Sequence, residues 1–237
     1  MENKLNRLFV GIIISSLVLI SYYFDLDFLF FSFISLLILF ECFSLKIFNK
    51  NFYFFLSIFI FSLINTSLYF IEFIPIYAVI INFILIITTF LTKKIKILFF
   101  FSLLIFLTIF HFILIENRNL FFLIFLFSFV NDTCAYIFGN LIGGRKIIPS
   151  ISPNKTWSGT LFSFFISSII LYLYFYNIII SLVLSSLFFF GDIYFSFIKR
   201  ELKIKDFSNI LSSHGGILDR IDSIYLFTIF LIPFLPV

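Results

Sequence analysis

Four aspartates in or beside apolar stretches are the residues whose types and spacing could do chemistry. Asp132 and Asp192 each lie within an apolar run, and Asp219 and Asp222 are three residues apart, which places them on one face of a helix. A carboxylate at membrane depth is costly unless it is paired or hydrated. Taken alone, each aspartate is as consistent with an ion pair between helices as with a metal or proton site.

The neighbours of these acids favour a site for phosphate and metal. Asp192 precedes Arg200 by eight residues, which puts it on the order of 12 Å below that end of a helix. Three carboxylates with oxygen donors suit Mg²⁺ together with substrate phosphates. An excess of bases in the same region attracts a polyphosphate, and these bases are Lys199, Arg200, Lys203, Lys205 and Arg220.

The turn before Asp219 contains His214, Gly215 and Gly216, and its backbone N–H groups at the start of a helix could also bind an anion. A loop that is basic only because of membrane topology is the plainer alternative. That alternative accounts for the lysines, and it leaves the clustered acids, the histidine and the glycine pair unexplained.

A second polar segment spans residues 139–158. It contains Gly139, Gly143 and Gly144, the bases Arg145 and Lys146, and the run from Ile151 to Gly159 that reads ISPNKTWSG. It offers glycines for close backbone approach, bases for phosphate and hydroxyls for hydrogen bonds, but it is not a Walker A motif. On its own, this composition is more typical of an ordinary loop than of a binding site.

The composition requires lipid as the solvent. Hydrophobic residues make up 62% of the 237 residues and charged ones 12%, with a mean hydropathy of +1.20, and soluble domains carry about twice that charged fraction. The 43 phenylalanines are interchangeable with Ile and Leu against acyl chains and carry no functional weight. Cys42 and Cys134 lie in apolar segments, which argues against a disulfide framework or a cysteine metal site.

The positions of charges and turn residues predict an all-α, polytopic membrane protein of about nine transmembrane helices, because a spanning helix needs about 20 apolar residues. The first is taken as an uncleaved helix rather than a signal peptide. With the N-terminus in the cytoplasm, fifteen of the sixteen bases fall on the cytoplasmic side and Arg118 does not, as the positive-inside bias requires. The predicted helices are 8–24, 28–45, 52–71, 74–91, 97–115, 120–139, 159–175, 177–198 and 221–236.

The two halves of the chain differ in character. Residues 1–118 are uniformly apolar N-terminal helices, whereas residues 119–237 contain seven of the eight glycines and the two polar segments 139–158 and 199–220. Because glycine permits tight turns and close approach, the second half is predicted to be the catalytic transmembrane region, with both polar segments in the cytoplasm.

The stretch from Ser196 to Asp222 carries a family resemblance. It reads SFIKR, four residues, KDFS and then LSSHGGILDRID, and it resembles the signature of the phosphatidate cytidylyltransferase (CDP-diacylglycerol synthase) family at every restricted position. The resemblance covers about residues 130–225, and the matching positions outside the signature are Asp132, Ala135, Tyr136, Gly139, Gly143, Ser152–Trp157 and Gly191–Asp192. Ser158 stands where the family usually has Glu or Gln, and Phe195 where an acidic residue is common.

The resemblance implies a nucleotidyltransferase that makes CDP-diacylglycerol and pyrophosphate from CTP and phosphatidate in phospholipid synthesis. It implies a multi-pass protein of the cell (inner) membrane whose active site faces the cytoplasm, with Mg²⁺ and room for a second cation. Membrane lipid is an expected partner, a homodimer is an expectation from resemblance alone, and no nucleic-acid partner is expected.

The same resemblance implies roles for particular residues. The metal ligands would be Asp192, Asp219 and Asp222; these three, with Lys199, Arg200 and His214, would form the catalytic set. Contacts to CTP and its phosphates would come from Ser152, Lys155, Thr156, Lys205, Gly215, Gly216, Arg220 and Asp132. His214 could donate to the leaving group or cap the glycine turn, and the sequence favours neither role.

Three alternatives stay open at this stage. A CTP-dependent kinase of polyprenol or phytol would release CDP instead of pyrophosphate. A transporter with buried proton-carrying aspartates should show inverted repeats or paired broken helices, and the sequence shows neither. A decayed enzyme is compatible with Ser158 and Phe195, and the intact run from Asp219 to Asp222 argues against it.

Overall fold

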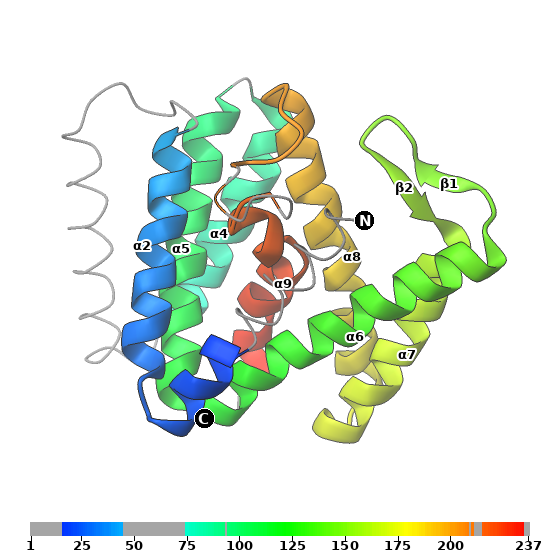
Figure 1. The fold of residues 1–237 in the computed structure, drawn as a ribbon. Coiled ribbons are helices and arrows are strands. Elements are labelled where there is room, and N and C mark those ends of the chain that lie inside the picture. The colour runs from blue at the N-terminus through cyan, green and yellow to red at the C-terminus, as the bar shows by residue number, and fades with distance from the viewer. Residues whose placement is uncertain (1–15, 45–73, 93, 209, 211–214, 235–237) are drawn as a thin grey trace. The chain divides into compact units, whose positions relative to one another are not determined.

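The computed structural model describes residues 16–44, 74–92, 94–208, 210 and 215–234, and these are predominantly helical (Figure 1). They form two compact units. The first is made of Met1–Glu116 and Ile204–Arg220, and the second of Asn117–Lys203 and Ile221–Val237. Each unit is best understood by itself.

The first unit contains α2 (Asp27–Ser44), α4 (Ile74–Leu91), α5 (Ile95–Glu116) and the start of α9 (Leu218–Leu231). Helix α5 packs against both α2 and α4 (Figure 1), which buries its phenylalanines and leucines almost all round. Polar groups also join the helices: Asn82 on α4 donates to the carbonyl of Ser102 on α5 at 2.8 Å, and the Ser102 hydroxyl donates back at 2.7 Å. Both side chains are buried, and this reciprocal pair satisfies them without water.

The second unit contains α6 (Arg118–Ile142), a β-hairpin, α7 (Trp157–Phe175), α8 (Ile178–Glu201), most of α9 and the short 3₁₀ helix η2 (Ile232–Phe234). Helix α7 packs against α6 on one side and α8 on the other. Local capping explains several of the helix ends: Asn117 accepts from the backbone N–H of Leu120, and Asn177 accepts from those of Ile179 and Ile180. Such caps satisfy N–H groups that lack partners within the helix.

The hairpin consists of β1 (Lys146–Ile148) and β2 (Ser152–Thr156), antiparallel, with Lys146 opposite Thr156 and Ile148 opposite Ser152. It replaces most of the loop that was expected over 139–158, whose first residues instead complete α6. The all-α prediction is therefore wrong for this segment. β-Branched residues favour a pleated strand and Pro149-Ser150 a turn, but strands this short leave little periodicity to detect.

Four helices among the described residues are long and apolar enough to cross a membrane: α5, α6, α7 and α8. The stretch Tyr77–Leu91 of α4 is also apolar but shorter. The predicted helix 52–71 and the first half of 8–24 lie outside the described residues, although residues 16–23 are helical. The helical class is thus confirmed, whereas the count of nine spans and the division at 118/119 stay predictions.

Candidate active site

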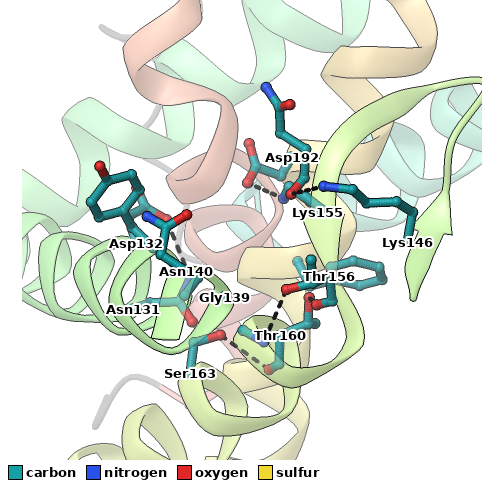
Figure 2. Close-up of a pocket in the computed structure, with 15 residues that line it drawn as sticks. Asn131, Asp132, Gly139, Asn140, Lys146, Lys155, Thr156, Thr160, Ser163 and Asp192 are labelled. Carbon is teal, nitrogen blue, oxygen red and sulfur yellow. Dashed lines mark hydrogen bonds and ion pairs between the residues drawn. The ribbon is translucent and has the colours of Figure 1, made fainter. Parts of the chain in front are cut away.

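A pocket of about 440 Å³ opens in the second unit between α6, the hairpin, α7 and α8. Figure 2 shows its polar side chains. Asp132 and Asn140 come from α6, Lys146 and Lys155 from the hairpin, Thr160 from α7 and Asp192 from α8. Two stretches that precede the signature in the chain and resemble the family therefore contribute residues to one cavity. Asp192, from the Gly191–Asp192 pair, lines the same cavity.

An ion pair between Lys155 and Asp192 is the central contact of this pocket. The two residues are 37 apart in the chain, and Figure 2 shows their side chains pointing toward one another. They are 24% and 23% exposed, so solvent still reaches them. The Lys155 ammonium also lies 5.3 Å from the ring centroid of Phe189, a cation–π contact that helps to hold a charge in a partly apolar site.

Two further carboxylates lie beside Asp192. The Asp222 carboxyl on α9 lies close enough to Asp192 on α8 and to Asp132 on α6 to experience the charge of both. Ser223 links the elements, since its hydroxyl donates to Asp132 at 3.4 Å and lies 2.7 Å from the hydroxyl of Ser128. Three acids from three helices therefore share a small region in which each repels the others.

Cationic side chains offset part of this repulsion. Lys155 forms the ion pair with Asp192, and its positive charge also attracts the Asp132 carboxylate. The positive charge of Lys199, in the last turn of α8, attracts the Asp222 carboxylate. A site with three carboxylates and few cations attracts additional positive charge. The donor chemistry therefore fits a hard divalent cation such as Mg²⁺. Over the described ranges, however, no three His, Cys, Asp or Glu side chains are arranged as ligands of one metal ion, and Lys155 stands as the counter-charge.

Close contact between helix backbones shapes the floor of the pocket. A Cβ added to Gly159 on α7 would collide with the carbonyl oxygen of Ala135 and lie 3.1 Å from the Cα of Gly139, both on α6. A Cβ on Gly191 would lie 2.5 Å from the carbonyl oxygen of Asp222. Because backbone atoms cannot rotate aside as a side chain can, these glycines set the distances between α6, α7, α8 and α9.

We expect Gly159→Ala to destabilise the folded protein by about 1–3 kcal/mol, the usual effect of overpacking. The sign is informative, because Gly→Ala at an open helical position stabilises by about 0.5–1 kcal/mol. Thermal unfolding in detergent measures the effect. Ser186→Ala, at a partly exposed position on α8, should stay within about 0.5 kcal/mol of wild type. A Gly159→Ala protein that unfolds at a higher temperature would contradict the close helix contact.

Thr156 also lines the pocket, whereas three other residues predicted for the site lie in the second unit outside its lining: Ser152, Lys199 and Arg200. Ser152 begins β2, and Lys199 and Arg200 occupy the last turn of α8. The Arg200 Nε donates to the carbonyl of Ile151 at 3.1 Å, which ties the end of α8 to the hairpin. Thr156 caps α7 by accepting from the backbone N–H of Gly159, so its hydroxyl also has a structural role.

The remaining predicted residues belong to the first unit. Asp219 there accepts two backbone hydrogen bonds through Oδ2, from Phe207 and from Gly216, each 2.9 Å long. Lys205, Gly215, Gly216 and Arg220 lie in the same segment, and His214 falls outside the described residues. Of the predicted metal set, the second unit therefore brings Asp192 and Asp222 together with Asp132, and Asp219 serves as an acceptor for its own loop.

The two departures from the family pattern have local partners. The Ser158 hydroxyl donates to the carbonyl of Gly143, and it lies 3.2 Å from the Thr156 hydroxyl. Phe195 is fully buried and packs edge-to-face on Tyr225 with ring centroids 5.1 Å apart. Neither residue lines the pocket.

One residue that the sequence interpretation missed is Glu41 on α2. Its buried carboxylate accepts hydrogen bonds from Ser208, Ile217 and Leu218. The signal was available, since an acid within an apolar run is the feature that singled out Asp132 and Asp192. Its connection to the signature segment could not be seen, because the partners are about 170 residues away along the chain.

Apolar helices that surround a pocket lined by both acids and bases define a helical, membrane-associated protein with a polar, charged site. A sequence profile of the cytidylyltransferase family matches residues 5–237. The chain belongs to this family.

Curated relatives carry a more specific name. Proteins named phosphatidate cytidylyltransferase are similar to this chain in Rickettsia bellii (43% identity over 111 residues; 40% of this chain and 48% of the relative) and in Rickettsia conorii (39% over 131 residues; 48% and 57%). A third, from Staphylococcus aureus, is 41% identical over 109 residues, or 42% of each chain. In these matches the chain spans about half the length of the relatives.

Proposed function

We propose that this protein is a phosphatidate cytidylyltransferase, which transfers CMP from CTP to phosphatidate to give CDP-diacylglycerol and pyrophosphate. The observation that carries the proposal is the meeting of Lys155 and Asp192 in one polar pocket. A nucleoside triphosphate requires a cationic side chain, which Lys155 on the hairpin provides. Its metal counter-ion requires an acidic one, which Asp192 on α8 provides. The names of the relatives support the same reaction.

The proposed reaction joins two anions, so charge neutralisation and alignment are the main tasks of the site. A phosphate oxygen of phosphatidate attacks the α-phosphorus of CTP, and the bond from that phosphorus to the bridging oxygen of pyrophosphate breaks. No side-chain nucleophile is needed, because the lipid phosphate is already ionised. Lys155 would exchange its contact with Asp192 for the triphosphate, and Lys146, which also lines the pocket, would add positive charge.

Mg²⁺ is part of the proposal. Asp192 and Asp222 would hold it, with Asp132 beside them, and Asp219 would join them as the family resemblance implies. The bound ion, and a second cation beside it, would supply positive charge to the phosphate oxygens of the attacking and leaving groups. The three carboxylates lie close enough together to repel one another, and a bound cation would relieve this repulsion, which supports the assignment.

The setting that we propose is a multi-pass protein of the cell (inner) membrane with about nine spans, its N-terminus and active site facing the cytoplasm. Four helices long and apolar enough to span a bilayer support the membrane location, and the positions of the lysines and arginines support the orientation. A polar pocket at the cytoplasmic surface of the membrane would admit soluble CTP while the acyl chains of phosphatidate remain in lipid. A homodimer is also proposed, on family resemblance alone.

Purified protein given CTP and phosphatidate in detergent should form pyrophosphate and CDP-lipid in equal amounts. EDTA should abolish both products, and added Mg²⁺ should restore them, because the carboxylates alone repel the substrates. Phosphatidate replaced by a polyprenol is the control. Release of CDP with phosphorylation of the alcohol would identify a kinase, and absence of any CDP-lipid would reject the proposed reaction.

A further inference from the structure

Glu41 is a buried acid in the N-terminal half that touches the signature segment. It lies near the end of α2, is 0% exposed, and accepts three hydrogen bonds from residues of the first unit. Ser208 donates its hydroxyl to Oε1 at 2.6 Å, the backbone N–H of Ile217 donates to the same oxygen at 2.8 Å, and that of Leu218 donates to Oε2 at 2.8 Å. Both carboxylate oxygens are thus directed at one short stretch of chain.

The hydrogen bonds from Ile217 and Leu218 to Glu41 hold the start of α9, which is part of the signature segment. Leu218 is the first residue of α9, so Glu41 binds N–H groups that have no acceptor within the helix. A carboxylate at this end also interacts favourably with the helix dipole. Because Asp219 lies in the first turn of α9, the position of that turn determines where its carboxylate lies.

Gly216 shows that the approach of Glu41 depends on the local sequence. A Cβ at this position would lie 2.6 Å from Glu41 Oε1 and 2.8 Å from the Ser208 hydroxyl. Only a residue without a side chain leaves room for the carboxylate beside the backbone. The second glycine of the His-Gly-Gly run therefore admits a carboxylate from α2, a role that is separate from binding phosphate.

The carboxylate of Asp219, which belongs to the segment itself, also holds it through hydrogen bonds. Asp219 Oδ2 accepts from Phe207 and Gly216, and the Phe207 ring stacks on Phe99 of α5 with centroids 5.7 Å apart. The described parts of the segment, 207–208 and 215–218, are therefore held by four backbone N–H groups and one hydroxyl on two acids. Glu41 is the member of this arrangement that comes from outside the signature.

We propose that Glu41 is a positioning residue for the signature segment, so that α2 contributes to catalysis although it lies outside that segment. This inference rests on the proposed function for its effect on turnover. It does not rest on that function for its effect on the structure of the loop. Charge-assisted hydrogen bonds are stronger and more directional than neutral ones, which is why an amide of the same shape cannot replace the carboxylate: its NH₂ group would face a donor.

The test compares Glu41→Gln with Ser35→Ala, a matched control on the same helix. Ser35 is equally buried, and its hydroxyl donates to the carbonyl of Phe31 one turn away. We expect Glu41→Gln to lower kcat about 10-fold or more, as loss of a group that orients a catalytic residue does, with a smaller change in the KM for CTP. Hydrogen exchange at the amides of residues 216–218 should become faster in Glu41→Gln and stay unchanged in Ser35→Ala.

Ser208→Ala is the milder variant for the case in which Glu41→Gln does not fold. It removes one donor from Glu41 Oε1, so kcat should fall and exchange at Ile217 should rise, both to a smaller extent than in Glu41→Gln. Folded variants with wild-type kcat overturn the inference, even if their melting temperature falls, because that pattern marks a role in stability alone. If the wild-type protein makes no CDP-lipid, the proposed function fails, and the exchange rates still decide whether Glu41 holds the segment.

Discussion

Asp192→Asn is expected to lower kcat about 1,000-fold, the upper range for loss of one well-placed charged or polar group in an active site. Asp192 is the acid that contacts Lys155, and its charge also acts on Asp222. The substitution keeps the shape of the side chain and removes its charge. If this carboxylate binds Mg²⁺ or orients Lys155, neither task survives in the amide. Initial rates of CDP-lipid formation at saturating CTP and Mg²⁺ measure the loss.

Stability should move independently of activity in this variant. Because Asp132, Asp192 and Asp222 repel one another, removing one charge should leave the melting temperature in detergent unchanged or higher. Functional sites often trade stability for activity in this way. Glu201→Gln is the matched control, since Glu201 is an exposed acid at the end of the same helix, and its turnover should equal that of wild type. Asp192→Asn with more than about a tenth of wild-type kcat would remove Asp192 from the site.

How much of this molecule could be predicted from sequence depended on how local the signals were. The predicted helix 74–91 coincides with α4, and the predicted break at Tyr176–Asn177 is present, with Tyr176 in a left-handed conformation and Asn177 as the cap of α8. Apolar runs and caps are encoded within a few residues. The hairpin was missed because three- and five-residue strands with polar residues carry no clear alternation.

The site was predictable only as far as motifs extend. Lys155 and Asp192 were both named as site residues, but their direct contact depends on how the hairpin packs beside α8, and nothing in either motif encodes that. The assignment of Asp219 to the metal came from resemblance, whereas its bonds to the backbone of 207 and 216 follow from the path of the loop. A carboxylate has about four lone-pair positions, so these bonds leave the predicted metal role open to experiment.

Lys155→Met should lower kcat/KM for CTP about 100-fold or more, with a large rise in KM. Methionine keeps a flexible apolar chain beside Phe189 and removes the ammonium. The pocket then presents Asp132, Asp192 and Asp222 to an anionic substrate with one fewer counter-charge. Steady-state rates over a range of CTP concentrations measure the change. Lys96→Met, at an exposed position on α5, controls for general loss of positive charge and should retain wild-type kinetics.

Binding of CTP without Mg²⁺ separates the roles of the two partners in this ion pair. Both substitutions should lower kcat/KM, yet they should change affinity for CTP in opposite directions. Lys155→Met should bind CTP more weakly than wild type, because it loses the cation. Asp192→Asn should bind more tightly, because it loses an acid that both repels the phosphates and competes for Lys155. If both variants weakened CTP binding equally, the ion pair would be a structural link between the hairpin and α8, and the phosphates would have to bind elsewhere in the pocket.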